Sequence, residues 1–268
     1  MMSELDELVQ NKVRQRIAAD EVAVSMIVRL VHSIEIATVA KACGFDSLYV
    51  DLEHCSFSMQ TTSQICIAAL DVGVTPFVRV PSHASEWVSR VLDGGAMGVI
   101  APHVSGAADA RAVVRGAKFP PFGERSVSIG TPQLRFRNWP LPEARAVMNR
   151  ETTVVAMIET TDALARADEI AGVEGVDIVM IGTNDLCADM GIDGQFEHQK
   201  VRDAYARVIE ACRKHGKATG VGGLASKPKL IEELVLAGAR YVSSGADLSF
   251  ILSAGAARAK EVRAIALR

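Results

Sequence analysis

Short apolar runs rich in β-branched residues alternate along the chain with longer segments whose apolar positions recur at helical spacing. Near-continuous apolar strands that alternate with helices indicate a parallel sheet covered on both faces. The chain has eight such runs, at residues 23–28, 47–51, 75–80, 97–102, 153–159, 177–182, 218–223 and 239–245. Because eight βα units fill a chain of 268 residues, the pattern predicts an α/β fold, a closed (β/α)8 or TIM barrel rather than an open doubly wound sheet.

Between these runs, apolar residues follow the period of an amphipathic helix. Helices are predicted at residues 33–43, 83–93, 106–117, 197–215, 227–237 and 249–267. Residues 119–150 break the alternation and are long for a connection, so we expect a functional or mobile loop there. No repeat, linker or low-complexity tract interrupts the chain, which predicts a single domain over residues 1–268.

Composition narrows the class of protein. The apolar fraction of 49%, the charged fraction of 23% and the net charge of −3 are ordinary for a globular enzyme. No basic cluster favours nucleic acid as a partner. No apolar run reaches the roughly 18 residues of a membrane span, and the N-terminus lacks the apolar region of a signal peptide. Five scattered cysteines without a C-x-x-C pair predict reduced thiols and a cytoplasmic location.

Two acidic residues stand at the carboxyl ends of neighbouring predicted strands, where barrel active sites lie. Glu159 and Asp185 each follow an apolar run directly. Together they could hold a hard divalent cation whose other ligands are substrate oxygens and water. The structural alternative is that each caps the following helix or pairs with an arginine.

Basic residues complete the predicted site. Arg79 lies within an apolar strand, where its guanidinium needs an anion; a fixed internal partner is one possibility, and we favour a substrate carboxylate or a developing oxyanion. His54 is the best general base, because imidazole titrates near neutrality. The neighbouring Asp51 and Glu53 would orient and tune it.

Two further residues are candidates on position alone. His103 follows the fourth strand and could face the mouth of the barrel. Arg125 belongs to a Gly-Glu-Arg loop that could clamp an anion or form a tight turn. No lysine stands at a strand end, which argues against Schiff-base chemistry.

Six segments also occur in the order and spacing of a known family: GFDSLYVDLEH, PFVRV, LDGGAMGVIAPHV, FPPFGERSV, AMIET and VEGVDIVMIGTNDLCADMG. They resemble the metal-dependent (class II) 2-oxo-acid aldolases of the HpcH/HpaI type, which include 4-hydroxy-2-oxoheptanedioate aldolase and 2-keto-3-deoxy sugar-acid aldolases. The resemblance implies a barrel of the phosphoenolpyruvate/pyruvate type. It also implies reversible cleavage of a 4-hydroxy-2-oxo acid to pyruvate and an aldehyde, in aromatic or sugar-acid catabolism.

The resemblance implies roles for individual residues. Glu159 and Asp185 would bind Mg²⁺, Mn²⁺ or Co²⁺. Arg79 would bind pyruvate and stabilise its enolate, and His54 would be the catalytic histidine. Asp93 would orient this histidine across a subunit interface.

The resemblance also implies supporting residues and an assembly. Asp51 and Glu53 would support the site, and Thr183 and Asn184 would contact the substrate carboxylate. The assembly would be a homo-oligomer, typically a hexamer built as a trimer of dimers, in which the C-terminal helix swaps between partners.

The chain departs from the family pattern around the aldehyde side of the site. Thr183 and Asn184 replace the usual Pro-Ala or Pro-Thr, Met157 replaces Gln, His103 replaces Met, and Arg29-Leu30-Val31 replaces Ser-Pro. Three alternatives therefore stay open: decarboxylation of oxaloacetate, cleavage of an acyl-CoA ester, and a barrel that binds a 2-oxo acid with little turnover.

Overall fold

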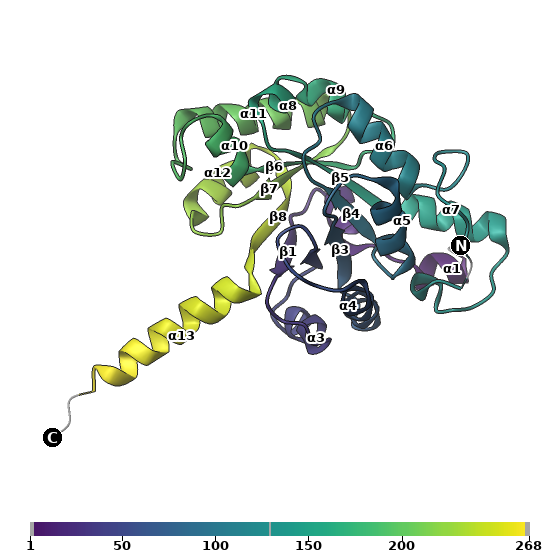
Figure 1. The fold of residues 1–268 in the computed structure, drawn as a ribbon, viewed down its shortest axis with the longest axis horizontal. Helices are drawn as coiled ribbons and strands as arrows, with labels where there is room; N and C mark the ends of the chain where they lie inside the picture. Colours follow the sequence, from purple (N-terminus) through teal and green to yellow (C-terminus); the bar gives the residue numbers. More distant parts are fainter. Residues whose placement is uncertain (1–2, 129, 266–268) are drawn as a thin grey trace.

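Eight parallel strands form a closed barrel in sequence order in the computed structural model, which describes residues 3–128 and 130–265 (Figure 1). The strands are β1 (Ala23–Val28), β2 (Ser47–Asp51), β3 (Thr75–Arg79), β4 (Gly98–Ala101), β5 (Thr153–Ile158), β6 (Ile178–Gly182), β7 (Ala218–Gly222) and β8 (Ala239–Ala246). Pairing of β1 with both β2 and β8 closes the sheet. The predicted TIM barrel is confirmed, and every strand lies within one residue of its predicted bounds.

Helices surround the barrel and follow most of the strands. They are α1 (Glu4–Leu8), α2 (Lys12–Ala18), α3 (Glu35–Ala42), α4 (Met59–Asp71), α5 (Ser85–Asp93), α6 (Ala107–Ala117), α7 (Leu141–Glu151), α8 (Thr161–Ala165), α9 (Ala167–Ala171), α10 (Thr183–Asp189), α11 (Gln199–Lys214), α12 (Pro228–Ala237) and α13 (Asp247–Arg263), with a 3-10 turn η1 (Pro132–Leu134). The expectation of one long loop over residues 119–150 is wrong, because this segment contains η1 and most of α7. Apolar side chains from the segment, among them Phe119, Leu134 and Met148, pack with Leu5 and Met97, and this burial fixes its course.

The barrel interior is filled at one end and open at the other. Phe77, Ile100 and Tyr241 are buried inside the barrel, and Val13 of α2 joins them from the end where the strands begin. Gly98 leaves space for the ring of Phe77, since a Cβ at residue 98 would lie 2.5 Å from ring carbons. Filling at this end leaves the carboxyl ends of the strands as the open mouth.

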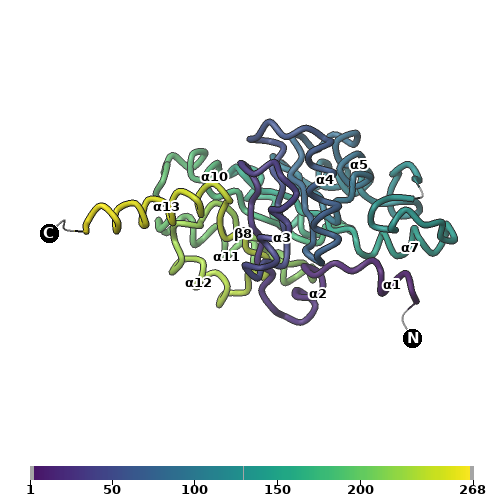
Figure 2. Tube along the Cα trace, turned by 90° about the horizontal axis from the view of Figure 1, so that it is seen from below, coloured from purple at the N-terminus to yellow at the C-terminus, as the bar shows by residue number. Residues whose placement is uncertain are grey.

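The C-terminal helix α13 leaves the barrel and projects away from it in both views (Figures 1 and 2). It starts at Asp247, two residues before the predicted helix, and residues 266–267 of that prediction lie outside the described part of the chain. Its large apolar side chains are exposed, Ile251 by 53% and Leu252 by 62%. An exchange of this helix between partners stays a prediction.

Two general features follow from the described residues. None of their helices combines the length and the apolar character that a membrane crossing needs. All five cysteines are free thiols.

Candidate active site

A cavity of 460 Å³ opens at the mouth of the barrel, and residues at or just after the ends of seven strands line it. It brings together six of the predicted site residues: His54, Arg79, Glu159, Thr183, Asn184 and Asp185. A larger hollow of 600 Å³ lies at the opposite end, beside α2 and the first residues of β5, β6 and β7. Catalytic groups of barrels gather where strands end, so the mouth cavity is the candidate active site.

Glu159 follows β5 and is buried, with one carboxylate oxygen left without a hydrogen-bond partner. Its Oε2 accepts a hydrogen bond from the backbone N–H of His103 at 2.7 Å, whereas Oε1 has no partner among the described residues. Burial raises the pKa of Glu159, and the nearby carboxylates of Glu53 and Asp185 raise it further, against the opposing hydrogen bond from His103. A buried carboxylate of this kind is stabilised by a cation beside it.

Neither acid is the N-cap of the following helix, and the ion pairs between described residues join neither of them to an arginine, although Glu159 pairs with His103. Thr160 is the N-cap of α8, and Gly182 precedes α10. Asp185 lies in the first turn of α10 and reaches the same cavity as Glu159. Gly182 makes this possible, because a Cβ at residue 182 would lie 2.6 Å from Oε1 of Glu159.

The donor set of the pair fits a hard divalent cation with an incomplete protein shell. No group of three or more histidine, cysteine or acidic residues surrounds a common position within the described ranges. Glu159 and Asp185 therefore offer two carboxylates, and water or substrate oxygens would supply the remaining ligands. The unpartnered Oε1 of Glu159 is the atom that such a cation would satisfy.

Arg79 ends β3 opposite Asp51 in the strand register and is almost fully buried. Its Nε and Nη2 donate to the two oxygens of Asp51 at 2.9 and 2.6 Å, and Nη1 lies 2.7 Å from a carboxylate oxygen of Glu53. Burial alone would raise the pKa of Asp51, but the hydrogen bonds from Arg79 and the charges of Arg79 and Arg29 outweigh it and lower this pKa. Arg79 thus has fixed internal partners and also lines the cavity.

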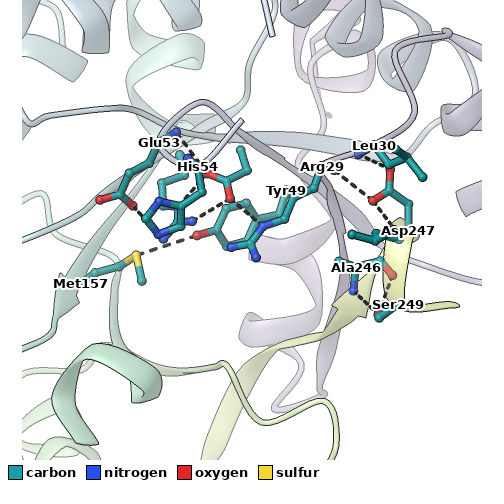
Figure 3. Close-up of polar contacts among 12 residues, drawn as sticks. Arg29, Leu30, Tyr49, Glu53, His54, Met157, Ala246, Asp247 and Ser249 are labelled. Carbon is teal, nitrogen blue, oxygen red and sulfur yellow. Dashed lines mark hydrogen bonds and ion pairs between the residues drawn. The ribbon is translucent and has the colours of Figure 1, made fainter. Parts of the chain in front are cut away.

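His54 lies in the turn after β2 and faces the same cavity. Its backbone N–H donates to Asp51 at 3.3 Å, and its Nε2 lies 3.8 Å from a carboxylate oxygen of Glu53. Figure 3 shows the imidazole of His54 beside the carboxylate of Glu53. Half of its side chain is exposed. Of the histidines that the structure describes, His54 alone lines the mouth cavity.

His103 stands between two carboxylates and does not line the mouth cavity. Its Nε2 lies 2.8 Å from Glu53 and its Nδ1 3.1 Å from Glu159. The backbone at His103 is left-handed, with φ of 55°, a conformation that is uncommon outside glycine. This turn directs both the backbone N–H and the ring of His103 to Glu159.

Thr183 and Asn184 begin α10 at the edge of the cavity. The Thr183 hydroxyl donates to the carbonyl of Gly222 at 2.6 Å and lies 2.8 Å from the Tyr205 hydroxyl. Because that hydroxyl already has two partners, a contact of Thr183 with substrate would come from its backbone. Such a contact stays a prediction, as does one from the exposed Asn184.

Asp93 and Arg125 contact each other, and neither lines the mouth cavity. Nη2 of Arg125 lies 2.6 Å from Asp93, and the buried guanidinium stacks 4.6 Å from the ring centre of Phe119. Gly123 makes the loop a tight turn, since a Cβ there would lie 2.2 Å from the carbonyl oxygen of Lys118. The role of Asp93 toward a histidine of a neighbouring subunit stays a prediction.

Two residues of the site were not predicted from the sequence. Arg29, noted only as a departure from the family pattern, lines the cavity, and its Nε lies 2.8 Å from Asp51. Asp247, at the start of α13, accepts hydrogen bonds from the backbone N–H groups of Arg29, Leu30 and Val31. Figure 3 shows Asp247 beside Arg29 and Leu30. A polar residue directly after the first strand was the one available signal for Arg29.

Comparison with known proteins gives one consistent result. The sequence profile of the HpcH/HpaI aldolase/citrate lyase family matches residues 10–254, which include every residue of the mouth cavity. The chain is 44% identical over 225 residues to the 4-hydroxy-4-methyl-2-oxoglutarate aldolase of Hapsidospora irregularis, a match that covers 83% of each chain. It is 33% identical over 224 residues to the 4-hydroxy-2-oxo-heptane-1,7-dioate aldolase of Escherichia coli, covering 83% of this chain and 84% of that one. The crystal structure of the HpcH/HpaI aldolase from Desulfitobacterium hafniense DCB-2 matches with a TM-score of 0.88 at 30% identity, over 96% of this chain and 98% of that chain.

Proposed function

The chain belongs to the HpcH/HpaI aldolase/citrate lyase family, and from this premise we propose that it is a class II pyruvate aldolase. The reaction is the reversible cleavage of a 4-hydroxy-2-oxo acid to pyruvate and an aldehyde. The observation that carries the proposal is the buried, unpartnered carboxylate oxygen of Glu159, in one cavity with Asp185, Arg79 and His54.

Glu159 and Asp185 would hold the divalent cation, Mg²⁺, Mn²⁺ or Co²⁺. When bound, such a cation supplies Lewis-acid polarisation of the substrate's 2-oxo group. Both residues present oxygen donors, which these metals prefer.

Arg79 would bind the end of the substrate that becomes pyruvate. Asp51 and Glu53 hold its guanidinium in place before substrate arrives, so little rearrangement is needed as negative charge develops on the 2-oxo oxygen. Loss of one such preorganised donor typically costs about 3 kcal/mol of transition-state stabilisation.

His54 would move the proton. It takes the proton of the 4-hydroxyl group; the C3–C4 bond breaks, its electron pair forms the enolate of pyruvate, and C4 becomes the carbonyl carbon of the second product. Return of a proton to C3 then gives pyruvate. A general base contributes roughly 10²–10⁴-fold to such a step. Asp93 of a neighbouring subunit would orient the imidazole.

The test measures pyruvate release from a panel of 4-hydroxy-2-oxo acids that also includes oxaloacetate. We expect EDTA to abolish release, and Mg²⁺, Mn²⁺ or Co²⁺ to restore it. Glu159→Gln should lose metal-dependent turnover, whereas the control Glu210→Gln, on the exposed face of α11, should keep it. Turnover that survives both chelation and Glu159→Gln would contradict the proposal, and release from oxaloacetate alone would favour the decarboxylase.

A further inference from the structure

Two arginines share one buried carboxylate at the mouth of the barrel. Oδ2 of Asp51 lies 2.6 Å from Nη2 of Arg79 and 2.8 Å from Nε of Arg29. Arg79 has a second acid in Glu53, but the terminal nitrogens of Arg29 make no hydrogen bond or ion pair within the described residues. Arg29 thus keeps donors free for an anion that is not part of the chain.

Arg29 and Glu159 stand on opposite walls of the same cavity. Arg29 directly follows β1 and Glu159 directly follows β5, and in a closed barrel of eight strands in sequence order these two strands face each other. Both residues line the cavity of 460 Å³, a volume suited to a small molecule. A substrate whose pyruvate half lies between Glu159 and Arg79 has Arg29 in the same cavity, beside Arg79, as a contact for its C4 half.

The backbone presents Arg29 rigidly while its side chain stays accessible. Asp247 is buried and accepts hydrogen bonds of 2.8–3.0 Å from residues 29, 30 and 31. The Arg29 side chain is 37% exposed. A fixed backbone and free terminal nitrogens suit Arg29 to ligand recognition, because the residue loses less conformational entropy when a ligand binds.

Resting on the proposed function, we propose that Arg29 binds a carboxylate on the C4 side of the substrate. A guanidinium pairs with a carboxylate through two parallel hydrogen bonds. The preferred substrates are then 4-hydroxy-2-oxo diacids, and the product that leaves with pyruvate is itself a short acid bearing a carbonyl group. A neutral C4 substituent would leave the free donors of Arg29 without a partner.

The experiment compares two substrates that differ in one group. The first is 4-hydroxy-4-methyl-2-oxoglutarate, with a carboxylate on C4, and the second is 4-hydroxy-4-methyl-2-oxopentanoate, with a methyl group there. The readout is the ratio of kcat/KM for the diacid to kcat/KM for the monoacid. We expect Arg29→Met to lower this ratio by about 10- to 100-fold, as for a lost hydrogen bond to a charged group, and Arg29→Lys to retain part of it.

A control and a second measurement separate the outcomes. Arg202→Met removes a cation from the outer face of α11, where Arg202 pairs with Glu233, and should leave the ratio unchanged. An unchanged ratio in Arg29→Met, or an equal loss for both substrates, would overturn the role of Arg29 as the recognition group. Metal-dependent deuterium exchange at the methyl group of pyruvate needs no C4 half. If the unsubstituted protein lacks both this exchange and pyruvate release, the proposed function fails and this inference fails with it.

Discussion

The position of Glu159, the proposed metal ligand, depends on the absence of a side chain at Gly182. A Cβ there would lie 2.6 Å from Oε1 and 2.7 Å from Cγ of Glu159, so Gly182→Ala must displace the carboxylate. We expect affinity for Mn²⁺, measured by isothermal titration calorimetry, to fall about 10- to 100-fold, as when the support of a metal ligand is lost. Gly106→Ala is the matched control, because its Cβ would meet atoms no closer than 3.6 Å. Equal affinity in the two variants would show that Glu159 is not a ligand.

At the scale of single residues, the sequence predicts part of the cavity lining: it misses Arg29, and its candidates Asp93 and Arg125 lie elsewhere. It does not predict which partners the side chains take. His54, Arg79, Glu159 and Asp185 share the cavity because parallel strands end at one edge of the barrel. Partners depend on contacts between distant segments. The hydrogen bonds that Asp247 accepts from the loop after β1 join residues 216 to 218 positions apart, and no local sequence pattern indicates them.

At the scale of elements, Lys118 joins the end of α6 to the end of α7. The side chain is buried, and its Nζ donates to the carbonyl oxygens of Asn149 and Thr152. Burial lowers the pKa of Lys118 to about 8 from its ordinary 10.5. Between about pH 8 and 10.5, Lys118 is protonated in the unfolded chain and deprotonated in the folded chain. The free energy of unfolding therefore rises with pH across this range.

Lys118→Met tests this expectation. The variant should be less stable overall, because two carbonyl groups lose their donor, at about 1–3 kcal/mol for each buried group left unsatisfied. It should also lack the rise in stability between about pH 8 and 10.5 that Lys118 gives the unsubstituted protein. Urea unfolding at several pH values measures both, with Lys217→Met as a control at a less buried lysine. If the free energy of unfolding depends on pH in the same way in Lys118→Met and Lys217→Met, the pKa of Lys118 is not lowered in the folded protein.

Strands were predictable to within one residue, and short helices were not. A barrel strand is buried on both faces, so the apolar run in the sequence covers the same residues as the hydrogen-bonded strand in the structure. By contrast α8, α9 and α10 have five to seven residues, too few for a helical period to stand out. In α7, prolines and charged residues dilute the apolar face, and burial against Leu5 and Met97 fixes the element instead.

At the scale of the whole molecule, α13 carries large apolar side chains at the surface, because each of its residues after Asp247 is exposed. Leu248, Ile251, Leu252 and Val262 are exposed by 41–62%, and at helical spacing they share one face. A helix of 17 residues that stands away from its domain gains little from packing, and most helical stability in proteins comes from packing. We therefore predict that α13 packs on a second copy of the chain, in the homo-oligomer that the family resemblance implies.

One charge on the apolar face of α13 should separate the copies. Ile251→Asp places a carboxylate among side chains that would be buried between subunits, a cost of several kcal/mol, so we expect multi-angle light scattering to report a smaller mass than for the unsubstituted protein. Ser253→Asp adds the same charge to the opposite side of the helix and should keep the mass unchanged. If Asp93 completes the site of a neighbouring subunit, Ile251→Asp should also lower pyruvate release while its circular dichroism stays that of an intact barrel. An unchanged mass in Ile251→Asp, or a mass of one chain in the unsubstituted protein, would rule out assembly through α13.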